Sequence, residues 1–344
     1  MRNHYSSIII AILGLGLATY LGGLSALYIT ALLAILEISL SFDNAVVNAK
    51  ILKTMETKWQ KRFILFGIPI AVFGMRFAFP IAIVAIASGM GVMETFNTAV
   101  ESPDEYHHIL LSVEALIFAF GGAFLLMVFL GFLFDRSRED TWIHMVEASR
   151  TLERAGEVKG AGILIASAIG IGIVSSTGSY EIAYAFFSGI LLYVAISTID
   201  GLLSVDGIRN GLIGFLYLEI LDASFSFDGV IGAFALSSNI FIIMIGLGIG
   251  AVFVRSMTIH MVEKDTLANY RYLEHGAHYA VLALAVIMLI KIFVPISEVL
   301  VGTIGVTIIG VSIYNSISIN KKELKIEIEK EVITSAKTNT HKEG

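Results

Sequence analysis

Ten apolar stretches, each about the length needed to cross a lipid bilayer, constrain this chain more than any other feature. A spanning helix takes about 20 apolar residues, and it satisfies its own backbone polar groups inside the bilayer. The sequence shows no alternating pattern long enough for a barrel strand. It therefore predicts an all-α, polytopic transmembrane helix bundle of about 9–10 spans. The expected spans are residues 7–23, 25–50, 63–90, 109–134, 161–177, 181–204, 211–237, 240–258, 272–294 and 297–316.

The stretch 7–23 is short and follows Arg2, an arrangement that also occurs in signal peptides. It has no convincing small-residue cleavage site after it. We therefore expect it to be retained as a span.

The composition excludes a soluble protein, because 56% of the residues are hydrophobic and only 15% are charged. Soluble domains carry about 25% charged residues. The chain has no cysteine, which excludes disulfides, thiolate metal sites and thiol catalysis. Glycine runs such as 246–250 lie inside apolar spans with no preceding strand, and they indicate close helix packing rather than nucleotide binding. We expect no enzyme activity, no organic cofactor and no nucleic-acid partner.

The basic residues predict the orientation in the membrane. With the N-terminus in the cytoplasm, 19 of the 23 lysines and arginines fall in the predicted inner segments and none in the predicted outer loops. The outer loop around 91–108 is acidic instead. This asymmetry follows the positive-inside rule. It predicts a multi-pass protein of the inner (plasma) membrane with both termini in the cytoplasm, a polar cytoplasmic loop at 135–160 and a charged cytoplasmic tail at 320–344.

Self-comparison reveals an internal repeat. Residues 37–44 read Glu-Ile-Ser-Leu-Ser-Phe-Asp-Asn, and residues 222–229 read Asp-Ala-Ser-Phe-Ser-Phe-Asp-Gly. Weaker matches pair the region before Arg76 with the region before Arg255, and Glu114 with Glu274. The two motifs cross the predicted bilayer in opposite directions, so the halves 7–177 and 181–316 form an inverted repeat. Many secondary transporters have this architecture, with a substrate site near the midplane.

Ionisable side chains in the middle of the bilayer cost roughly 2.5–3.5 kcal/mol each on insertion scales. Two arginines within spans cannot neutralise all the acids of this set, and a bound cation would supply the missing positive charge. The alternative is a structural network of buried acid–arginine ion pairs. The acids concerned are Glu37, Asp43, Glu114, Asp222, Asp228 and Glu274, and the arginines are Arg76 and Arg255.

The two motifs offer hard oxygen ligands, which suit magnesium, calcium or manganese. The candidate metal ligands are Glu37, Asp43, Asn44, Asp222 and Asp228, with Ser41, Asn48, Arg76, Glu114, Ser226, Arg255 and Glu274 in support.

Helix periodicity places four of these side chains within about 60° of one another on one face. These four are Glu37, Ser41, Asn44 and Asn48. Asp43 lies about 120° from Glu37, so a straight helix does not aim both acids at one small ion. A broken helix near the Ser-Phe-Asp segment is the other solution; Gly229 fits a break in the second half, whereas Asn44 does not require one in the first.

With these motifs the sequence resembles the TerC family of integral membrane proteins, most closely a bacterial branch known only as a domain of unknown function. The stretches that carry the resemblance are 37–49, 71–76, 217–233 and 271–278. The resemblance implies that Asp43 with Asn44 matches the family's first Asp-Asn motif and that Asp228 matches the aspartate of the second. The chain departs from the second motif, because Gly229-Val230-Ile231 stands where many TerC proteins have Ser-Ile-Pro. This departure bears on the identity of the metal more than on the presence of a site.

The wider family is associated with tellurite (tellurium) resistance, with manganese export in bacteria and, in a chloroplast relative, with membrane-protein insertion. The resulting hypothesis is a secondary transporter that exports a divalent cation, manganese(II) foremost, driven by a proton or sodium gradient. The alternative is a non-transporting membrane factor that assists membrane-protein assembly. A third class, an intramembrane hydrolase, requires Asp43 and Asp228 to share a proton at about 3 Å.

Overall fold

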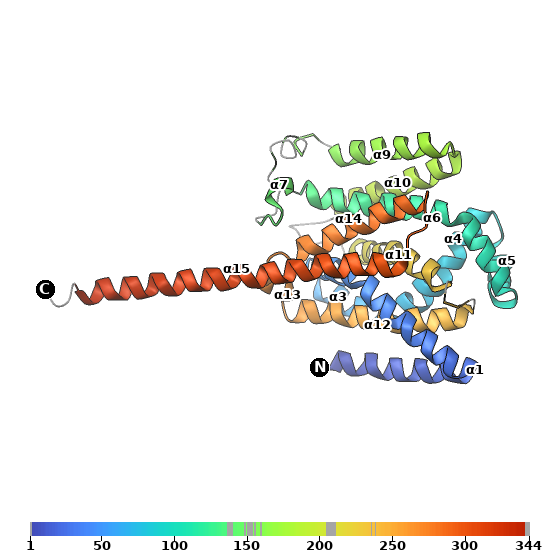
Figure 1. Cartoon of the computed structure of the whole chain (residues 1–344), viewed down its shortest axis with the longest axis horizontal. Coiled ribbons are helices and arrows are strands. Elements are labelled where there is room, and N and C mark those ends of the chain that lie inside the picture. Colours follow the sequence, from blue (N-terminus) through green and yellow to red (C-terminus); the bar gives the residue numbers. More distant parts are fainter. Residues whose placement is uncertain are drawn as a thin grey trace.

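A computed structural model describes residues 2–135, 140–147, 149, 154, 156–158, 160–203, 211–234, 236–237 and 239–340 (Figure 1). Every regular element among these residues is a helix. The helices are α1 (Arg2–Leu40), α2 (Phe42–Lys53), α3 (Thr57–Pro69), the π-helix η1 (Ile70–Ala78), α4 (Phe79–Ser88), α5 (Val92–Glu101), α6 (Pro103–Leu133), α7 (His144–Glu147), α9 (Ala161–Thr177), α10 (Tyr180–Leu203), α11 (Gly211–Phe234), α12 (Ile240–Glu263), α13 (Thr266–Asn269), α14 (Leu273–Lys291) and α15 (Glu298–Thr340).

The all-α, multi-pass prediction is confirmed. Seven helices in the described part of the chain are long and apolar enough to cross a membrane, and α9 is a shorter apolar helix. The helix α1 is not one straight rod: it turns back at Gly22 and Gly23, where the φ of Gly23 is +67°. A positive φ of this kind favours glycine, because a side chain is strained there. The turn divides α1 close to the boundary expected between the spans 7–23 and 25–50.

The bundle has two distinct ends in Figure 1. The N-terminus, the C-terminal extension of α15, α7 and α13 lie toward one end, which we name the N/C end. The turn of α1, α5 and the α9–α10 turn lie toward the other, which we name the α5 end. The helix α15 continues far beyond the bundle at the N/C end, well past the expected span 297–316.

Small residues set how closely α1 and α12 approach each other. A Cβ added at Gly246 would lie 2.6 Å from the Cβ of Leu33, and one added at Gly14 would lie 2.9 Å from Ile249. Ala18, Ala26 and Ala34 of α1 pack against isoleucines of α12 in the same cluster. Small residues at such positions allow close backbone contact between membrane helices. The glycine run 246–250 thus serves helix packing, as its sequence context predicted.

The helix break lies in the first half, not the second, so the expectation drawn from Gly229 was wrong. Ser41 has φ −102° and ψ 17° and separates α1 from α2. The helix α11 continues without interruption through Gly229. Glycine permits a break but does not impose one, and at Gly229 it serves a close contact described below.

The segment 140–147 is fastened to the bundle at the N/C end. The Asp140 carboxylate lies 2.6 Å from Nε of Arg271, and Arg271 also contacts Glu323 of α15 at 2.8 Å. The Glu147 carboxylate lies 3.2 Å from Nε2 of His275 on α14. These pairs hold the described part of the loop against α14 and α15.

We expect this attachment to weaken in acid. Burial opposes ionisation of Glu147, but hydrogen bonds from His275 and from the Ile143 and Trp142 backbone outweigh it and lower the pKa of Glu147. A carboxyl with a lowered folded-state pKa stabilises the fold above its unfolded pKa of about 4.3, and this contribution is lost as the pH falls through the folded value.

The attachment can be followed by the fluorescence of Trp142, which packs edge-on against Tyr279, in a Trp59→Phe background. The emission should stay constant from pH 7 to about pH 5 and shift to the red below about pH 4. Glu147→Gln should show the red-shifted emission already at pH 7. An unchanged spectrum in Glu147→Gln at pH 7 would contradict the role of this carboxylate.

Candidate functional site

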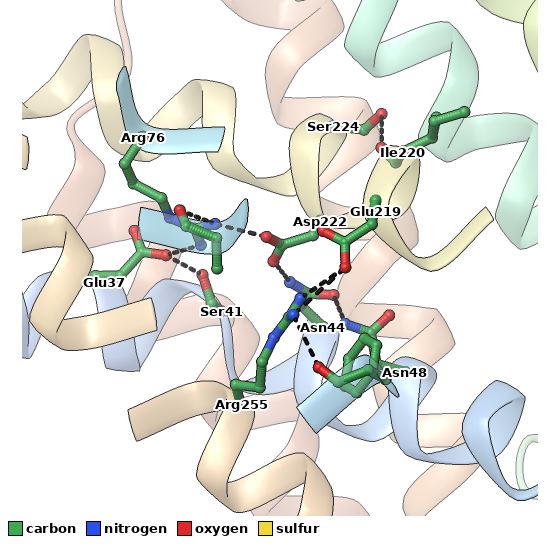
Figure 2. A network of polar contacts seen from close by, with 12 residues as sticks. Glu37, Ser41, Asn44, Asn48, Arg76, Glu219, Ile220, Asp222, Ser224 and Arg255 are labelled. Carbon is green, nitrogen blue, oxygen red and sulfur yellow. Dashed lines mark hydrogen bonds and ion pairs between the residues drawn. The ribbon is translucent and has the colours of Figure 1, made fainter. Parts of the chain in front are cut away.

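A buried arginine joins the two halves of the chain at the centre of the bundle (Figure 2). Nη2 of Arg76 lies 2.6 Å from Oε1 of Glu37, and Nη1 lies 2.6 Å from Oδ2 of Asp222. The residues come from η1, the end of α1 and α11, and each is at most 4% exposed. One guanidinium therefore ties both repeat-related acids of the two motifs together.

The helix α2 adds a row of polar groups to this arginine centre. The Asn44 amide donates to Oδ1 of Asp222 at 2.7 Å, and the Asn48 amide donates to Oδ1 of Asn44 at 2.7 Å. The Ser41 hydroxyl donates to Oε1 of Glu37 at 2.9 Å. The face predicted from helix periodicity for Glu37, Ser41, Asn44 and Asn48 therefore forms one side of the network in Figure 2.

A second arginine, Arg255 of α12, pairs with an acid that the sequence analysis missed. Its Nη2 and Nη1 atoms lie 3.3 and 3.4 Å from Oε1 of Glu219. Its guanidinium carbon lies 4.1 Å from the centre of the Phe63 ring. Glu219 comes three residues before Asp222 in the same apolar span, so an ionisable residue at that depth was the available signal.

Because Gly67 has no side chain, the Arg255 guanidinium has room to lie against the backbone at this position. A Cβ at Gly67 would lie 1.4 Å from Nη1 of Arg255. A Cβ at Gly74 would instead meet Ile70 at 3.4 Å, an ordinary contact. Alanine substitutions at these two glycines therefore separate the effect of a steric clash on stability from the general effect of replacing glycine by alanine.

We expect Gly67→Ala to destabilise the protein by about 1–3 kcal/mol, as overpacking commonly does, because Arg255 must leave Glu219. Gly74→Ala, the matched control, should melt within about 0.5 kcal/mol of the wild type. Thermal unfolding in detergent compares the two. Equal melting temperatures for the two variants would show that Arg255 tolerates a side chain at position 67.

Two glycines of the second half enclose Glu37. A Cβ at Gly250 of α12 would lie 2.5 Å from the Cβ of Glu37, and one at Gly229 of α11 would lie 3.0 Å from Oε2 of Glu37. Gly229 thus leaves room for the Glu37 carboxylate beside α11.

Asp43 lies apart from the arginine network, on the other face that its 120° offset predicted. Its carboxylate is 4% exposed and accepts a hydrogen bond from the backbone N–H of Asn44 at 2.9 Å. The described part of the chain gives it no ion pair. It borders a cavity of about 20 Å³, enough for one water-sized particle. The cavity is lined by Ser39, Leu40, Asp43, Phe225, Ala280, Ala283, Leu284, Val301, Gly302 and Gly305.

The charges at the centre do not balance. Three acids of the network, Glu37, Glu219 and Asp222, face two arginines, and Asp43 adds a fourth carboxylate nearby in sequence. Among the described residues of the two motifs and of this network, Nε of Arg76 and three buried oxygen atoms have no hydrogen-bond partner. The three oxygen atoms are Oδ1 of Asn48, Oε2 of Glu219 and Oγ of Ser226. The centre thus has spare oxygen acceptors and an excess of acidic groups.

The structure does not bring all predicted residues together. Glu274 pairs with Lys50 at 2.7 Å at the N/C end, and Glu114 borders a separate cavity with Lys291. Asp228 belongs to α11, but its side chain lies outside the described residues, so its distance from Asp43 and with it the hydrolase alternative stay untested. Among the residues that the structure describes, no three His, Asp or Glu side chains form a group able to hold a metal ion.

The fold and this centre define a polytopic membrane protein whose helices enclose a buried acid–arginine network between two sequence-related halves. The chain belongs to the family described as "Protein of unknown function (DUF475)", which matches residues 42–323. The resemblance to a family known only as a domain of unknown function is thereby confirmed. The match includes Asp43, Arg76, Asp222 and Arg255 and begins after Glu37. No curated protein and no solved structure matches the chain.

Proposed function

We propose that this protein is a secondary transporter of a divalent metal cation, with manganese(II) as the foremost substrate. The observation that carries the proposal is Asp43, a buried carboxylate without an ion pair among the described residues, bordering a cavity the size of one small particle. Burying a lone carboxylate is costly unless a proton or a cation neutralises it. The available donors are oxygen atoms, which suit manganese, magnesium or calcium.

Arg76 holds the remaining acids in place while no substrate is bound. Glu37 and Asp222 would repel each other without the guanidinium between them. Asn44 connects the two parts of the centre, because its backbone N–H binds Asp43 and its side chain binds Asp222. A cation that draws the Asp43 carboxylate toward itself therefore acts on the arginine network through Asn44.

The resemblance to TerC proteins supports the manganese assignment and the export direction, and it brings tellurite resistance as a further phenotype to test. The distribution of basic residues supports placing the N/C end in the cytoplasm and the protein in the inner membrane. The sequence carries no ATP-binding motif. A proton or sodium gradient is therefore the proposed driving force.

A second candidate function is a membrane factor that assists the assembly of other membrane proteins. It is favoured by the Glu37–Arg76–Asp222 arrangement, in which the arginine already neutralises two acids without any metal. In this case the network only orients helices. The factor would bind protein partners and would show no dependence on divalent cations.

Calorimetry on the purified protein in detergent separates the two candidates. Manganese, calcium, magnesium and zinc are titrated into the wild type and into the Asp43→Asn/Asp228→Asn double variant. Manganese binding that disappears in a folded double variant would support the transporter. A folded wild type that binds none of the four ions would favour the assembly factor.

A further inference from the structure

Two ion pairs with partly exposed side chains join the two halves of the chain at the N/C end of the bundle. Lys50 of α2 lies 2.7 Å from Glu274 of α14. Lys53, at the end of α2, pairs with Asp265, which lies between α12 and α13. Each lysine belongs to the first half of the chain and each acid to the second. Together the two pairs fasten the end of α2 to the α12–α14 connection.

The α5 end has a cavity instead. A cavity of about 780 Å³ lies between α6, α11 and the segment that joins α14 to α15. Glu114 and Lys291 border it, and the Lys291 ammonium lies 5.2 Å from the centre of the Phe118 ring. The cavity reaches α11 at Ile231 and Gly232, shortly after the second motif.

Some residues that line this cavity also line a groove that reaches the surroundings of Asp43. Gly232 borders both this cavity and an apolar groove of about 640 Å³ along α1 and α15. Ser39, Leu40 and Gly302 border both that groove and the small cavity at Asp43. The groove between the two cavities is apolar, and its walls include the exposed side chains of Ile35 and Val299.

The repeat relates the two ends to each other. Glu114 lies early in α6 and Glu274 early in α14, and self-comparison pairs these two glutamates. The helices run in opposite directions, so each glutamate stands nearer a different end, and each has a lysine in its surroundings: Lys291 for Glu114 and Lys50 for Glu274. Inverted repeats commonly provide two such related halves that exchange conformations in alternating access.

We infer that the structure is the state of the transporter that is open toward the α5 end, and that Lys50–Glu274 and Lys53–Asp265 form the gate that closes the N/C end. This inference rests on the proposed transport function. The gate is mechanically tied to the site, because α2 carries Asn44 in its first turn and both gate lysines in its last turn. Release toward the N/C end requires both ion pairs to separate.

Cross-linking tests the gate directly, since the chain contains no cysteine and every introduced thiol is unique. A direct disulfide needs Cα atoms about 4.4–6.8 Å apart, whereas a bifunctional reagent also links thiols that are farther apart. Lys50→Cys/Glu274→Cys is therefore linked with a short bis-methanethiosulfonate reagent, which dithiothreitol removes. Each single-cysteine variant, treated in the same way, is the matched control.

We expect linking to abolish manganese transport by the double variant in vesicles and dithiothreitol to restore it. The reagent should leave the transport rate of each single-cysteine variant at its value before treatment. Full transport by the linked variant would overturn the gate but leave the proposed function standing. A wild type that transports no divalent cation would contradict the proposed function itself.

A second measurement follows the reaction rate of an introduced thiol and does not depend on a transport assay. Ile231→Cys borders the large cavity and should react with a small membrane-impermeant thiol reagent applied from the α5 side. Adding Lys50→Glu places like charges at the gate and should slow this reaction severalfold, as the N/C end opens and the α5 end closes. Lys50→Glu/Glu274→Lys should restore the rate. A rate that Lys50→Glu leaves unchanged would overturn the inference.

Discussion

Arg76→Met should lower the stability of the protein strongly, because it removes the guanidinium that two buried acids share. Methionine fills much of the same volume but leaves Glu37 and Asp222 buried, close together and without a counter-ion. Removing one partner of a buried ion pair typically costs about 3–5 kcal/mol. For a chain of this size we expect a fall in melting temperature of roughly 5–10 °C. Thermal unfolding in detergent measures it.

Two controls make this result specific to the buried charges. Arg62→Met removes an arginine that lies half-buried over the Trp59 ring at 4.4 Å, and it should change the stability by less than about 1 kcal/mol. Arg76→Met combined with Glu37→Gln and Asp222→Asn removes the unpaired charges and should recover most of the loss. If Arg76→Met and Arg62→Met have the same melting temperature, groups other than Arg76 hold Glu37 and Asp222 in place.

The fold and one face of the site follow from the sequence for simple reasons. Apolar length predicts spanning helices because the bilayer permits little else. Helix periodicity places Ser41 and Asn44 on the side of Glu37 because both lie within the turns that share its face. The same periodicity separates Asp43 from Glu37. These conclusions need only local geometry.

Self-comparison of the sequence could not identify Glu219 as a residue of the buried network. Its repeat-related position is occupied by Ala34, so the pair Arg255–Glu219 has no counterpart in the first half. Arg76 instead bridges acids from both halves. The two related halves predicted from the sequence are thus asymmetric in their charges. Only the packing of α12 against α3 and α11 shows which acid Arg255 reaches.

Gly229 illustrates the other limit of sequence reasoning. A glycine in a span is compatible with a broken helix, with close packing or with neither. The choice depends on what lies opposite, and here the Glu37 carboxylate approaches from α1. The break falls at Ser41, the N-cap of α2. Serine favours this position, but it also occurs within helices, so its presence alone does not predict a break.

Asp43→Asn and Asp222→Asn should separate transport from stability. Asparagine at position 43 keeps the shape and can still accept the backbone N–H of Asn44 through its amide oxygen, and no ion pair among the described residues is lost. We expect Asp43→Asn to melt within about 1 kcal/mol of the wild type and to lose manganese transport in vesicles. Asp222→Asn removes the charge opposite Arg76 and should cost about 3–5 kcal/mol.

The exposed acid Asp104 at the start of α6 provides the matched control, because Asp104→Asn removes one negative charge at the α5 end without touching the centre. It should retain both stability and transport. Wild-type transport by Asp43→Asn would refute the substrate role of Asp43. A melting temperature of Asp43→Asn as low as that of Asp222→Asn would show that Asp43 belongs to the structural network. The transporter requires that these two aspartates, 179 positions apart and joined through Asn44, differ in what they do: one binds the substrate and the other holds the helices that surround it.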